Sequence, residues 1–424
     1  MATSLREEDA LAHIHGVCFK TGPPGRVGAE LEWLVHDRAD PRLAVSTQRL
    51  DAAVAGLQAP DAFPNGSRLT REPGGQIELS SPPATSLAEC VRMMDVDGAT
   101  LRRALDASGL LVVGSGLDPH REPPRISRHP RYRAMEAYFD RGGPWGRMMM
   151  GATAAIQINL DAGDDTPGAS GYRHRWTLAH RLGPVLVAAF ANSPVWRGRA
   201  TGWVSTRQAV WARIDPARTR APRHDDDPRT SWADYALHAP LLCVRRSPPA
   251  DWSAPHGLTF QQWLKGAPGL PPPTLDDLDY HLTTLFPPVR PRGWLELRMI
   301  DAQAGGNWIV PVALATMLLD DPIAADAAFA ATASLCRDRS AVPPPEVWSR
   351  AARLGPSEPE LGAAVIACFA AAEGALARAG APDSLRRAVS EFADRYPSRG
   401  RCPAHDQLDA LRDGVASDLL EGAS

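Results

Sequence analysis

The stretch VGAELEWLV, residues 27–35, sets two glutamates one residue apart among apolar neighbours, and similar polar pairs recur three times along the chain. Side chains alternate between the two faces of a strand, so each polar pair points one way and its apolar neighbours point the other. The four pairs are Glu30 and Glu32, Gln76 and Glu78, Gln157 and Asn159, and Glu296 and Arg298. The pattern predicts strands that belong to one sheet with a polar face.

The carboxylates of these pairs would converge on the polar face of such a sheet. Several carboxylates cannot all stay ionised in one cleft without a compensating charge. Mg²⁺ takes oxygen ligands and bridges phosphate groups, so the pattern indicates a metal-dependent nucleotide site. A single pair is typical of the solvated face of an antiparallel strand. Four pairs built from carboxylate, amide and guanidinium groups favour the site.

Composition allows a large enzyme and excludes several other classes. The 424 residues are 44% hydrophobic, enough for a substantial core in one large domain or two coupled ones. A net charge of -3 argues against a nucleic-acid partner. The N-terminal segment lacks the signature of a secretory signal, and no apolar run of about 18 residues stands out as a membrane span. We expect a cytoplasmic protein with no membrane partner.

The six scattered cysteines form no C-x-x-C pair, and a chain of this length needs no disulfide framework. We therefore expect free thiols. Cys402 and His405 have ligand-like spacing, but without a second Cys or His pair their spacing does not predict a zinc site.

Helices and strands are expected to mix without a regular βαβ rhythm. Helices are predicted near residues 1–20, 87–108 and 172–192 and over most of the Ala-rich region after Asn307; strands at 27–37, 110–116, 148–163, 232–244 and 293–301; and an exposed loop at 217–232. Pro73 and Gly74 are expected at the centre of a type II turn. The order favours an α+β fold with a curved antiparallel sheet, its wet concave side carrying the site and helices behind it.

Other nucleotide-binding fingerprints are absent from the sequence. The nearest string to a Walker loop, GVCFKTG at 16–22, lacks the second glycine before Lys20. No G-x-G-x-x-G follows a predicted strand, and no G-x-S-x-G elbow is present. Neither a P-loop, a Rossmann site nor a hydrolase nucleophile is predicted.

Seven strings occur in the order seen in the glutamate-cysteine ligases of plants and bacteria, which the chain resembles from about Val27 to Asp321. They are REPGGQIELSSP, MMMGATAAIQINLD, FANSPVWRGRATGWVSTRQAVW, DPARTR, DYALHAPL, DDLDYHLTTLFPPVR and GWLELRMIDAQ. The resemblance implies a fold similar to glutamine synthetase, with an antiparallel sheet forming a funnel-shaped active site. It implies one domain over residues 1–424, with a mainly helical region from about 308 to 424. The Arg-rich composition is most similar to the actinobacterial members that serve ergothioneine synthesis.

The resemblance also implies roles for individual residues. The implied magnesium ligands are Glu30, Glu32, Glu72, Glu78 and Glu296. Gln157 and Asn159 would lie near the metal and phosphates, with Arg298 against the transferring phosphoryl group. Arg207, Trp211 and Arg218 would shape the amino-acid and nucleotide pockets, although Trp211 could equally serve packing, and Arg218 a surface ion pair.

The implied reaction joins the side-chain carboxylate of glutamate to the amine of cysteine, through an acyl phosphate formed with ATP and Mg²⁺. The chain departs from plant members at Leu242 and Cys243. Plant members have a tyrosine there, which borders the cysteine pocket. A carboxylate-amine ligase with another amine therefore stays open as an alternative. An inactive nucleotide-binding scaffold is disfavoured, because such a protein has no need to keep mutually repelling carboxylates.

Overall fold

The computed structural model describes residues 5–122, 129–223, 227–247, 249–336 and 340–414. Its main sheet has seven strands in the order β2-β3-β1-β5-β9-β8, with β4 paired to the far end of β1, and every pairing is antiparallel. These strands are β1 (Val27–Asp37), β2 (Arg68–Arg71), β3 (Ile77–Ser80), β4 (Leu110–Val113), β5 (Ala155–Asp161), β8 (Val289–Pro291) and β9 (Trp294–Asp301). A separate ribbon joins β6 (Val195–Trp196) to β7 (Arg199–Ala200).

Helices surround the sheet. They are α1 (Glu7–Cys18), α2 (Thr47–Val54), α3 (Leu87–Asp106), α4 (Pro130–Phe139), α5 (Trp145–Ala152), α6 (Tyr172–Phe190), α7 (Thr206–Ile214), α8 (Pro216–Thr219), α9 (Pro228–His238), α10 (Phe260–Leu264), α11 (Leu275–Leu282), α12 (Ile309–Asp320), α13 (Pro322–Ala331), α14 (Pro345–Leu354), α15 (Pro359–Arg378), α16 (Asp383–Arg395) and α17 (Pro403–Arg412). The predicted α+β class, with an antiparallel sheet and a helical C-terminal region, is confirmed.

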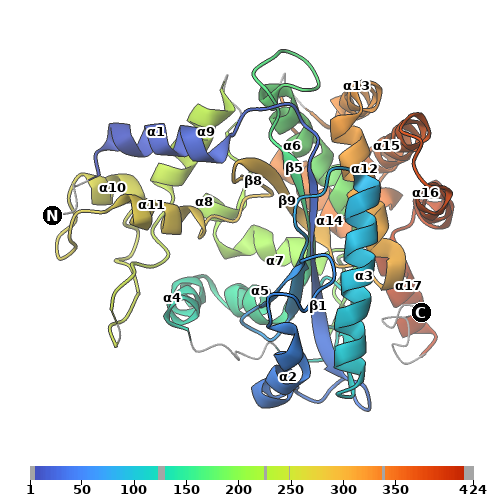
Figure 1. The fold of residues 1–424 in the computed structure, drawn as a ribbon, viewed down its shortest axis with the longest axis horizontal. Helices are drawn as coiled ribbons and strands as arrows, with labels where there is room; N and C mark the ends of the chain where they lie inside the picture. The colour runs from blue at the N-terminus through green and yellow to red at the C-terminus, as the bar shows by residue number, and fades with distance from the viewer. Residues whose placement is uncertain (1–4, 123–128, 224–226, 248, 337–339, 415–424) are drawn as a thin grey trace.

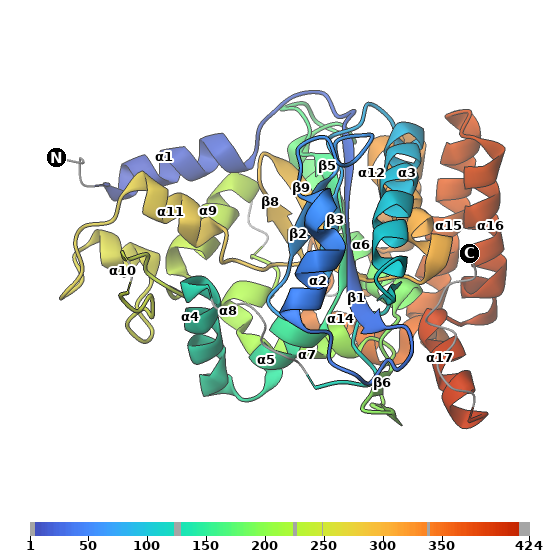
Figure 2. The same cartoon turned by 60° about the horizontal axis from the view of Figure 1, so that its bottom comes forward.

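The apolar face of the sheet packs against helices. Leu31, Ile158 and Leu297 are almost fully buried in one large core cluster that also contains side chains of α3, α6 and α12. In Figures 1 and 2 these helices lie on one side of the sheet, with α15 and α16 beyond them, while α1, α4, α9, α10 and α11 lie on the other side. The polar face of the sheet therefore looks toward this second group of helices.

The strand predicted over residues 232–244 is wrong, because residues 228–238 form helix α9. Asp227 caps the helix by accepting a hydrogen bond from the Arg229 amide, and Pro228 takes the first helical position, which suits its fixed φ angle. Trp232, Ala233, Ala236 and Leu237 are its buried residues, and their spacing is helical. Two further boundaries differ: residues 145–152 form helix α5, and α8 and α9 occupy both ends of the loop predicted at 217–232. Residues 224–226 of that loop lie outside the described residues.

The turn between β2 and β3 also differs from its prediction. The Gly75 amide donates to Glu72 O at 3.0 Å and the Glu72 amide donates to Gln76 O at 2.9 Å. The residue with positive φ is Gly75, at 90°, whereas a type II turn would need it at Gly74. A three-residue loop followed by a left-handed glycine matches a type I turn with a G1 bulge.

The C-terminal helices belong to the same core as the sheet, since Leu361, Phe369 and Phe392 lie in its cluster. Helix α15 is long and apolar enough to cross a membrane by length and composition, contrary to the sequence expectation, and the bent pair 305–320 and 322–331 passes the same test jointly. Half of the α15 window is buried inside the structure. Core helices of soluble proteins pass this test too, so it is weak evidence for a membrane span. The six cysteines are free, and all but Cys336 are buried.

Candidate active site

The strand register brings the predicted polar residues together on one face of the sheet. Directly paired residues present their side chains on the same face. One row across the sheet contains Arg290, Glu296, Asn159 and Gly28; the next contains Gln157, Glu30 and Ser80; and the third contains Glu32, Glu78 and Thr70. Asn159 and Glu296, which are 137 positions apart in sequence, thus become direct neighbours. Gln76 is the exception, because its amide instead donates to Thr153 O at 2.9 Å and fixes the β2–β3 hairpin.

Amide side chains hold the glutamates of β1 and β3. Gln157 Nε2 donates to Glu32 Oε1 at 2.9 Å and lies 3.4 Å from Glu78 Oε2. Asn159 Nδ2 donates to Glu30 Oε1 at 2.9 Å. The second oxygen of Glu32 accepts from the Ala155 amide at 2.9 Å. Gln157 and Asn159 thus lie beside Glu30, Glu32 and Glu78, three of the predicted metal ligands.

The four carboxylates Glu30, Glu32, Glu72 and Glu78 destabilise one another's charge. Burial, together with the neighbouring carboxylates, raises the pKa of Glu32, Glu72 and Glu78 to about 7 each. The pKa of Glu30 is raised by burial and then by Glu296. A raised carboxyl pKa means that the ionised cluster lacks compensating positive charge.

The donor set of this cluster suits a hard divalent cation, which prefers carboxylate oxygen. Among the residues that the structure describes, no group of three or more His, Cys, Asp or Glu side chains could hold a metal ion as placed. The carboxylates are instead turned toward Gln157, Asn159 and Thr70. The chemistry therefore fits a cation, and the side chains would need to rotate to ligate it.

Glu296 has different surroundings from the other four glutamates. It is fully buried, and its two oxygens accept from Arg290 at 2.5 and 3.1 Å, from Arg292 at 3.3 Å and from Arg298 at 3.0 Å. Despite its burial, these guanidinium groups hold the pKa of Glu296 far below its ordinary value. Glu296 as placed is the shared counter-ion of three arginines, and its predicted role as a metal ligand gains no direct support.

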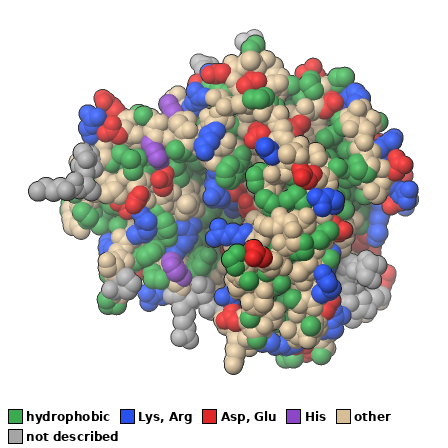
Figure 3. All heavy atoms as spheres, viewed as in Figure 1, with side chains coloured by type: hydrophobic (Ala, Val, Ile, Leu, Met, Phe, Trp, Pro, Cys, Tyr) green, Lys and Arg blue, Asp and Glu red, His purple; other side chains and the backbone are tan. Residues whose placement is uncertain are grey.

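Arg290 and Arg292 were missed by the sequence analysis. They alternate in VRPR, residues 289–292, immediately before the predicted strand at 293–301, and Arg290 pairs with Glu296 across β8 and β9. That period-two spacing of two arginines was the available signal. In the view of Figure 3, Lys and Arg side chains gather near the middle of the molecular surface, beside a hollow.

Arg298 joins the acidic and basic halves of the site. Its Nη1 atom hydrogen-bonds to both Glu296 Oε2 and Gln157 Oε1. Gln157 in turn donates to Glu32. The pKa of Arg298 stays above its ordinary value because Glu296, Glu32 and Glu30 outweigh the effect of burial. It is therefore a fixed positive charge at the edge of the acidic cluster.

Arg207 and Trp211 lie beside Arg298 in a small cavity that also contains Phe286 and Met299. Arg207 is 3% exposed; its Nη2 donates to Arg298 O at 2.9 Å, and its Nη1 makes no hydrogen bond but lies 3.8 Å from Asp301 Oδ1, with which it forms a buried ion pair. The indole N–H of Trp211 is also buried without a partner. Both atoms are buried donors without a hydrogen bond at one cavity, and a carboxylate could accept from both.

Arg218 lies apart from these residues and is fully buried. Its guanidinium donates to Asp215 at 2.9 Å and to the carbonyl oxygens of Thr284 and Pro240 at 2.8 and 2.5 Å. These bonds tie three loops together. A surface ion pair is therefore wrong for Arg218, and its predicted role in substrate binding gains no support from this position.

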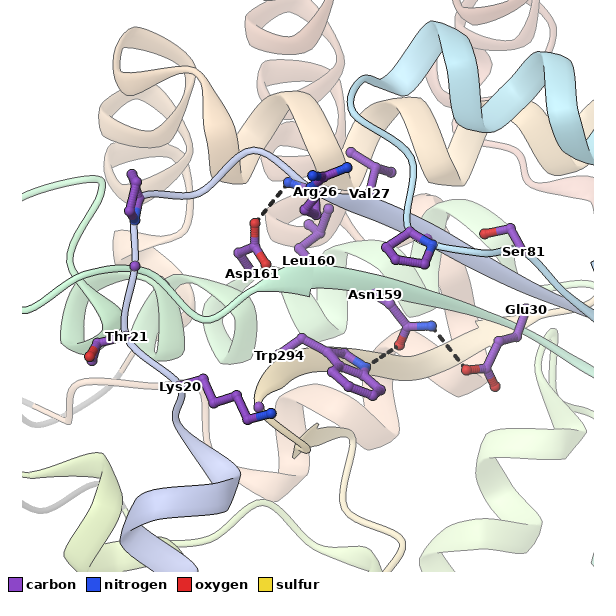
Figure 4. Close-up of a pocket in the computed structure, with 15 residues that line it drawn as sticks. Lys20, Thr21, Arg26, Val27, Glu30, Ser81, Asn159, Leu160, Asp161 and Trp294 are labelled. Atoms are coloured by element: carbon purple, nitrogen blue, oxygen red, sulfur yellow. Dashed lines mark hydrogen bonds between the residues drawn. The ribbon is translucent and has the colours of Figure 1, made fainter. Parts of the chain in front are cut away.

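A larger cavity of about 490 Å³ opens beside Glu30. Besides Glu30, its charged and polar lining residues are Lys20, Thr21, Arg26, Ser81, Asn159, Asp161 and Trp294, and the rest are glycine, proline and aliphatic residues. Figure 4 shows a hydrogen-bonded chain from Trp294 through Asn159 to Glu30, with Lys20 on the Trp294 side. Its volume lies in the range of about 300–1,000 Å³ that is typical of small-molecule sites.

Comparison with known proteins gives a consistent result. The model of glutamate-cysteine ligase family 2 matches residues 26–421. The chain is 40% identical to glutamate-cysteine ligase EgtA of Mycolicibacterium smegmatis, over 98% of this chain and 94% of that protein. It is 30% identical to the chloroplastic glutamate-cysteine ligase of Arabidopsis thaliana, over 75% of this chain and 63% of that one.

A solved structure shares the fold at low sequence identity. The crystal structure of glutamate-cysteine ligase from Francisella tularensis in complex with AMP has a TM-score of 0.56 and 11% identity, over 94% of this chain and 87% of that one. This likeness agrees with the predicted fold class.

Proposed function

The chain belongs to glutamate-cysteine ligase family 2, and from this premise we propose that it joins the side-chain carboxylate of L-glutamate to the amine of L-cysteine at the expense of ATP. The product is γ-glutamylcysteine, and ergothioneine synthesis is the pathway that it supplies. One observation carries the proposal: Arg298 hydrogen-bonds both to Gln157, beside the acidic cluster, and to Glu296, which also binds Arg290 and Arg292. Phosphoryl transfer to a carboxylate needs this combination of charges.

ATP is assigned to the 490 Å³ cavity beside Glu30. Lys20 and Arg26 offer positive charge there, and Trp294 offers an aromatic surface. The cavity ends at Glu30 and Asn159, so phosphates that leave it would reach the carboxylate cluster. The assignment places the triphosphate between that cluster and the arginines of β8 and β9.

Glu30, Glu32, Glu72 and Glu78 are proposed to hold Mg²⁺, with Glu296 at its edge. When bound, Mg²⁺ would neutralise these carboxylates and spread the negative charge of the phosphates. The chain contributes the crowding itself: four carboxylates with raised pKa values gain stability when a cation arrives. Gln157 and Asn159 hold the carboxylates until then.

Arg207 and Trp211 are proposed to receive the glutamate, because each has a buried donor without a hydrogen bond beside Arg298. A carboxylate oxygen of glutamate then attacks the γ-phosphorus, ADP leaves, and Arg298 stabilises the negative charge of the transferring group. The amine of cysteine attacks the acyl carbon, phosphate leaves, and the amine loses a proton. No nucleophile from the chain takes part.

The cysteine side chain is assigned to the cluster that contains Leu242 and Cys243. Both residues are buried against the same aromatic and methionine cluster that includes Tyr132, Trp211 and Tyr280. The cluster adjoins the Arg207 cavity through Trp211. We also propose that residues 1–424 form one cytoplasmic domain, which the shared core of the sheet and the C-terminal helices supports.

Phosphate release from ATP tests the proposal. The assay contains Mg²⁺ and glutamate, and candidate amines are added one at a time. We expect turnover that requires both glutamate and cysteine, with γ-glutamylcysteine identified by mass spectrometry. Turnover with a different amine would show that this amine, and not cysteine, is the substrate. Absence of turnover with every amine would overturn the ligase assignment.

A further inference from the structure

Strand β9 contains a bulge at the residue proposed to act on the phosphoryl group. Ile156 of β5 pairs with Ile300, but Ile158 pairs with Leu297, so Arg298 and Met299 both lie opposite Gln157. Strict alternation would put Ile300 on the polar face after Glu296 and Arg298. The extra residue instead returns Ile300 to the core and pairs Asp301 with Ala155. Bulges of this kind occur beside active sites, where they redirect a side chain.

A bulge interrupts the ladder, and its carbonyl groups need other partners. Here helix α7 supplies them through consecutive side chains. Arg207 Nη2 donates to Arg298 O at 2.9 Å, and Gln208 Nε2 donates to Met299 O at 2.7 Å. Both bulge carbonyls are therefore held from the same turn of one helix.

The start of α7 is itself fixed to β9, two residues beyond the bulge. Ser205 caps the helix by accepting from the Gln208 amide at 3.2 Å, and its hydroxyl donates to Asp301 Oδ1 at 3.0 Å. Gln208 is thus tied to β9 by its backbone through Ser205 and by its side chain through Met299 O. The distance between α7 and the bulge has little freedom.

We propose that Gln208 is a positioning residue, which holds the β9 bulge through Met299 O and thereby aims the Arg298 guanidinium at Gln157 and Glu296. The effect on catalysis rests on the proposed function, in which Arg298 stabilises the transferring phosphoryl group. Gln208 itself touches no reacting atom. Loss of its amide frees the Met299 carbonyl and lets the bulge relax, so Arg298 loses its fixed direction. Because Gln208 also lines the Arg207 cavity, the KM for glutamate is measured beside kcat.

Three variants test the role of the amide. Gln208→Met keeps the length of the side chain and removes the donor, and Gln208→Lys restores a donor of similar reach. Gln261→Met is the matched control. Gln261 lies in helix α10, and its side-chain amide donates one hydrogen bond of the same length to Glu7 Oε1 of helix α1. Phosphate release with glutamate and cysteine gives kcat and KM, and hydrogen exchange of peptides from residues 294–301 reports the bulge directly.

We expect Gln208→Met to lower kcat by about tenfold or more, with the KM for glutamate changed by less than about twofold. Gln208→Lys should recover most of that loss, and Gln261→Met should behave as wild type. Adding Gln208→Met to Arg298→Lys should slow the enzyme little further, since both act through one guanidinium. In Gln208→Met, the β9 peptide should exchange faster.

An unchanged kcat in Gln208→Met, a loss confined to KM, or losses that multiply in the double variant would overturn the positioning role. Should Gln208→Met not fold, Gln208→Glu takes its place, because it keeps the length and polarity and also lacks the donor. If the wild-type chain shows no turnover, the proposed function fails by itself. The exchange of β9 in the variants then still decides whether Gln208 holds the bulge.

Discussion

Glu30 and Glu296 have the same predicted role but opposite electrostatic surroundings. The pKa of Glu30 is raised by burial and by Glu296, so its charge is unfavourable in the folded chain. The pKa of Glu296 is lowered by three arginines, so its charge is favourable there. The same substitution should therefore have opposite effects on stability at the two positions.

Glu296→Gln is expected to lower the free energy of unfolding by about 3 kcal/mol, because it removes the counter-ion of three arginines from a buried site. Glu30→Gln should leave stability unchanged or raise it, since it relieves repulsion. Both variants should lose most of their activity. Urea unfolding without Mg²⁺ measures the difference, and equal effects on stability would contradict the distinction.

The stability difference between wild type and Glu78→Gln should depend on pH. The pKa of Glu78 rises from its ordinary 4.5 to about 7 on folding, so between these values the folded chain binds the proton more tightly than the unfolded chain. The stability that this proton contributes is present at low pH and is lost as pH rises through 7. At pH 5, where Glu78 is protonated, the two proteins should melt at similar temperatures.

At pH 8, where wild-type Glu78 is ionised among other carboxylates, the Gln variant should melt at a higher temperature. The measurement is thermal unfolding in a chelator across this pH range. Comparing two chains that differ at one residue cancels the titration of histidines such as His281, whose pKa burial lowers to about 3. A difference that stays constant with pH would contradict the crowded-carboxylate interpretation.

At the scale of elements, the alternating strands were predictable and their irregularities were not. Period-two patterning locates β1, β5 and β9 because each has one polar and one apolar face, although the polar face is also largely buried. The bulge at Arg298 and Met299 has one trace in the sequence: the polar residues Arg298 and Asp301 are three positions apart, whereas a regular strand would space them by two. The strand prediction for residues 232–244 failed because a short apolar run does not distinguish a strand from a buried helix. The helix-capping pair Asp227 and Pro228 was the signal that would have indicated a helix.

The hairpin that carries Glu72 depends on close packing at a glycine. A Cβ atom on Gly74 would lie 2.4 Å from both Cα and O of Gly151 in helix α5. We expect Gly74→Ala to push the hairpin away from α5, to lower the free energy of unfolding by about 1–3 kcal/mol and to reduce activity by displacing Glu72. Gly56→Ala is the control, since a Cβ there meets nothing within 4 Å. Equal melting temperatures for the two variants would contradict this packing argument.

At the scale of the whole molecule, the strand order could not be derived from the sequence. Strand β1 lies between β3 and β5, and β9 reaches β5 across more than 130 residues. That arrangement gives Glu296 its partner Arg290 from β8 and sets Gln157 between Glu32 and Arg298. Composition and patterning could indicate that the polar strands converge, but which side chains touch depends on contacts that only the folded chain shows.

The continuous core predicts that the chain unfolds as one unit. Side chains of α1, α3, α6, α12, α15 and α16 belong to the same buried cluster, and the sheet packs directly on α6 and α12. Tryptophan fluorescence and far-ultraviolet circular dichroism should therefore report the same single transition in denaturant. Two separate transitions would show that the C-terminal helices form an independent domain.

The scarcity of lysine makes it possible to label the proposed nucleotide cavity selectively. The chain has only Lys20 and Lys265, and Lys20 lines the cavity whereas Lys265 is exposed in the segment after helix α10. An amine-reactive reagent can therefore modify just two side chains and the N-terminal amine. Mass spectrometry after labelling would then read the occupancy of the cavity as the ratio of modified Lys20 to modified Lys265, with the second lysine as a built-in standard in the same molecule.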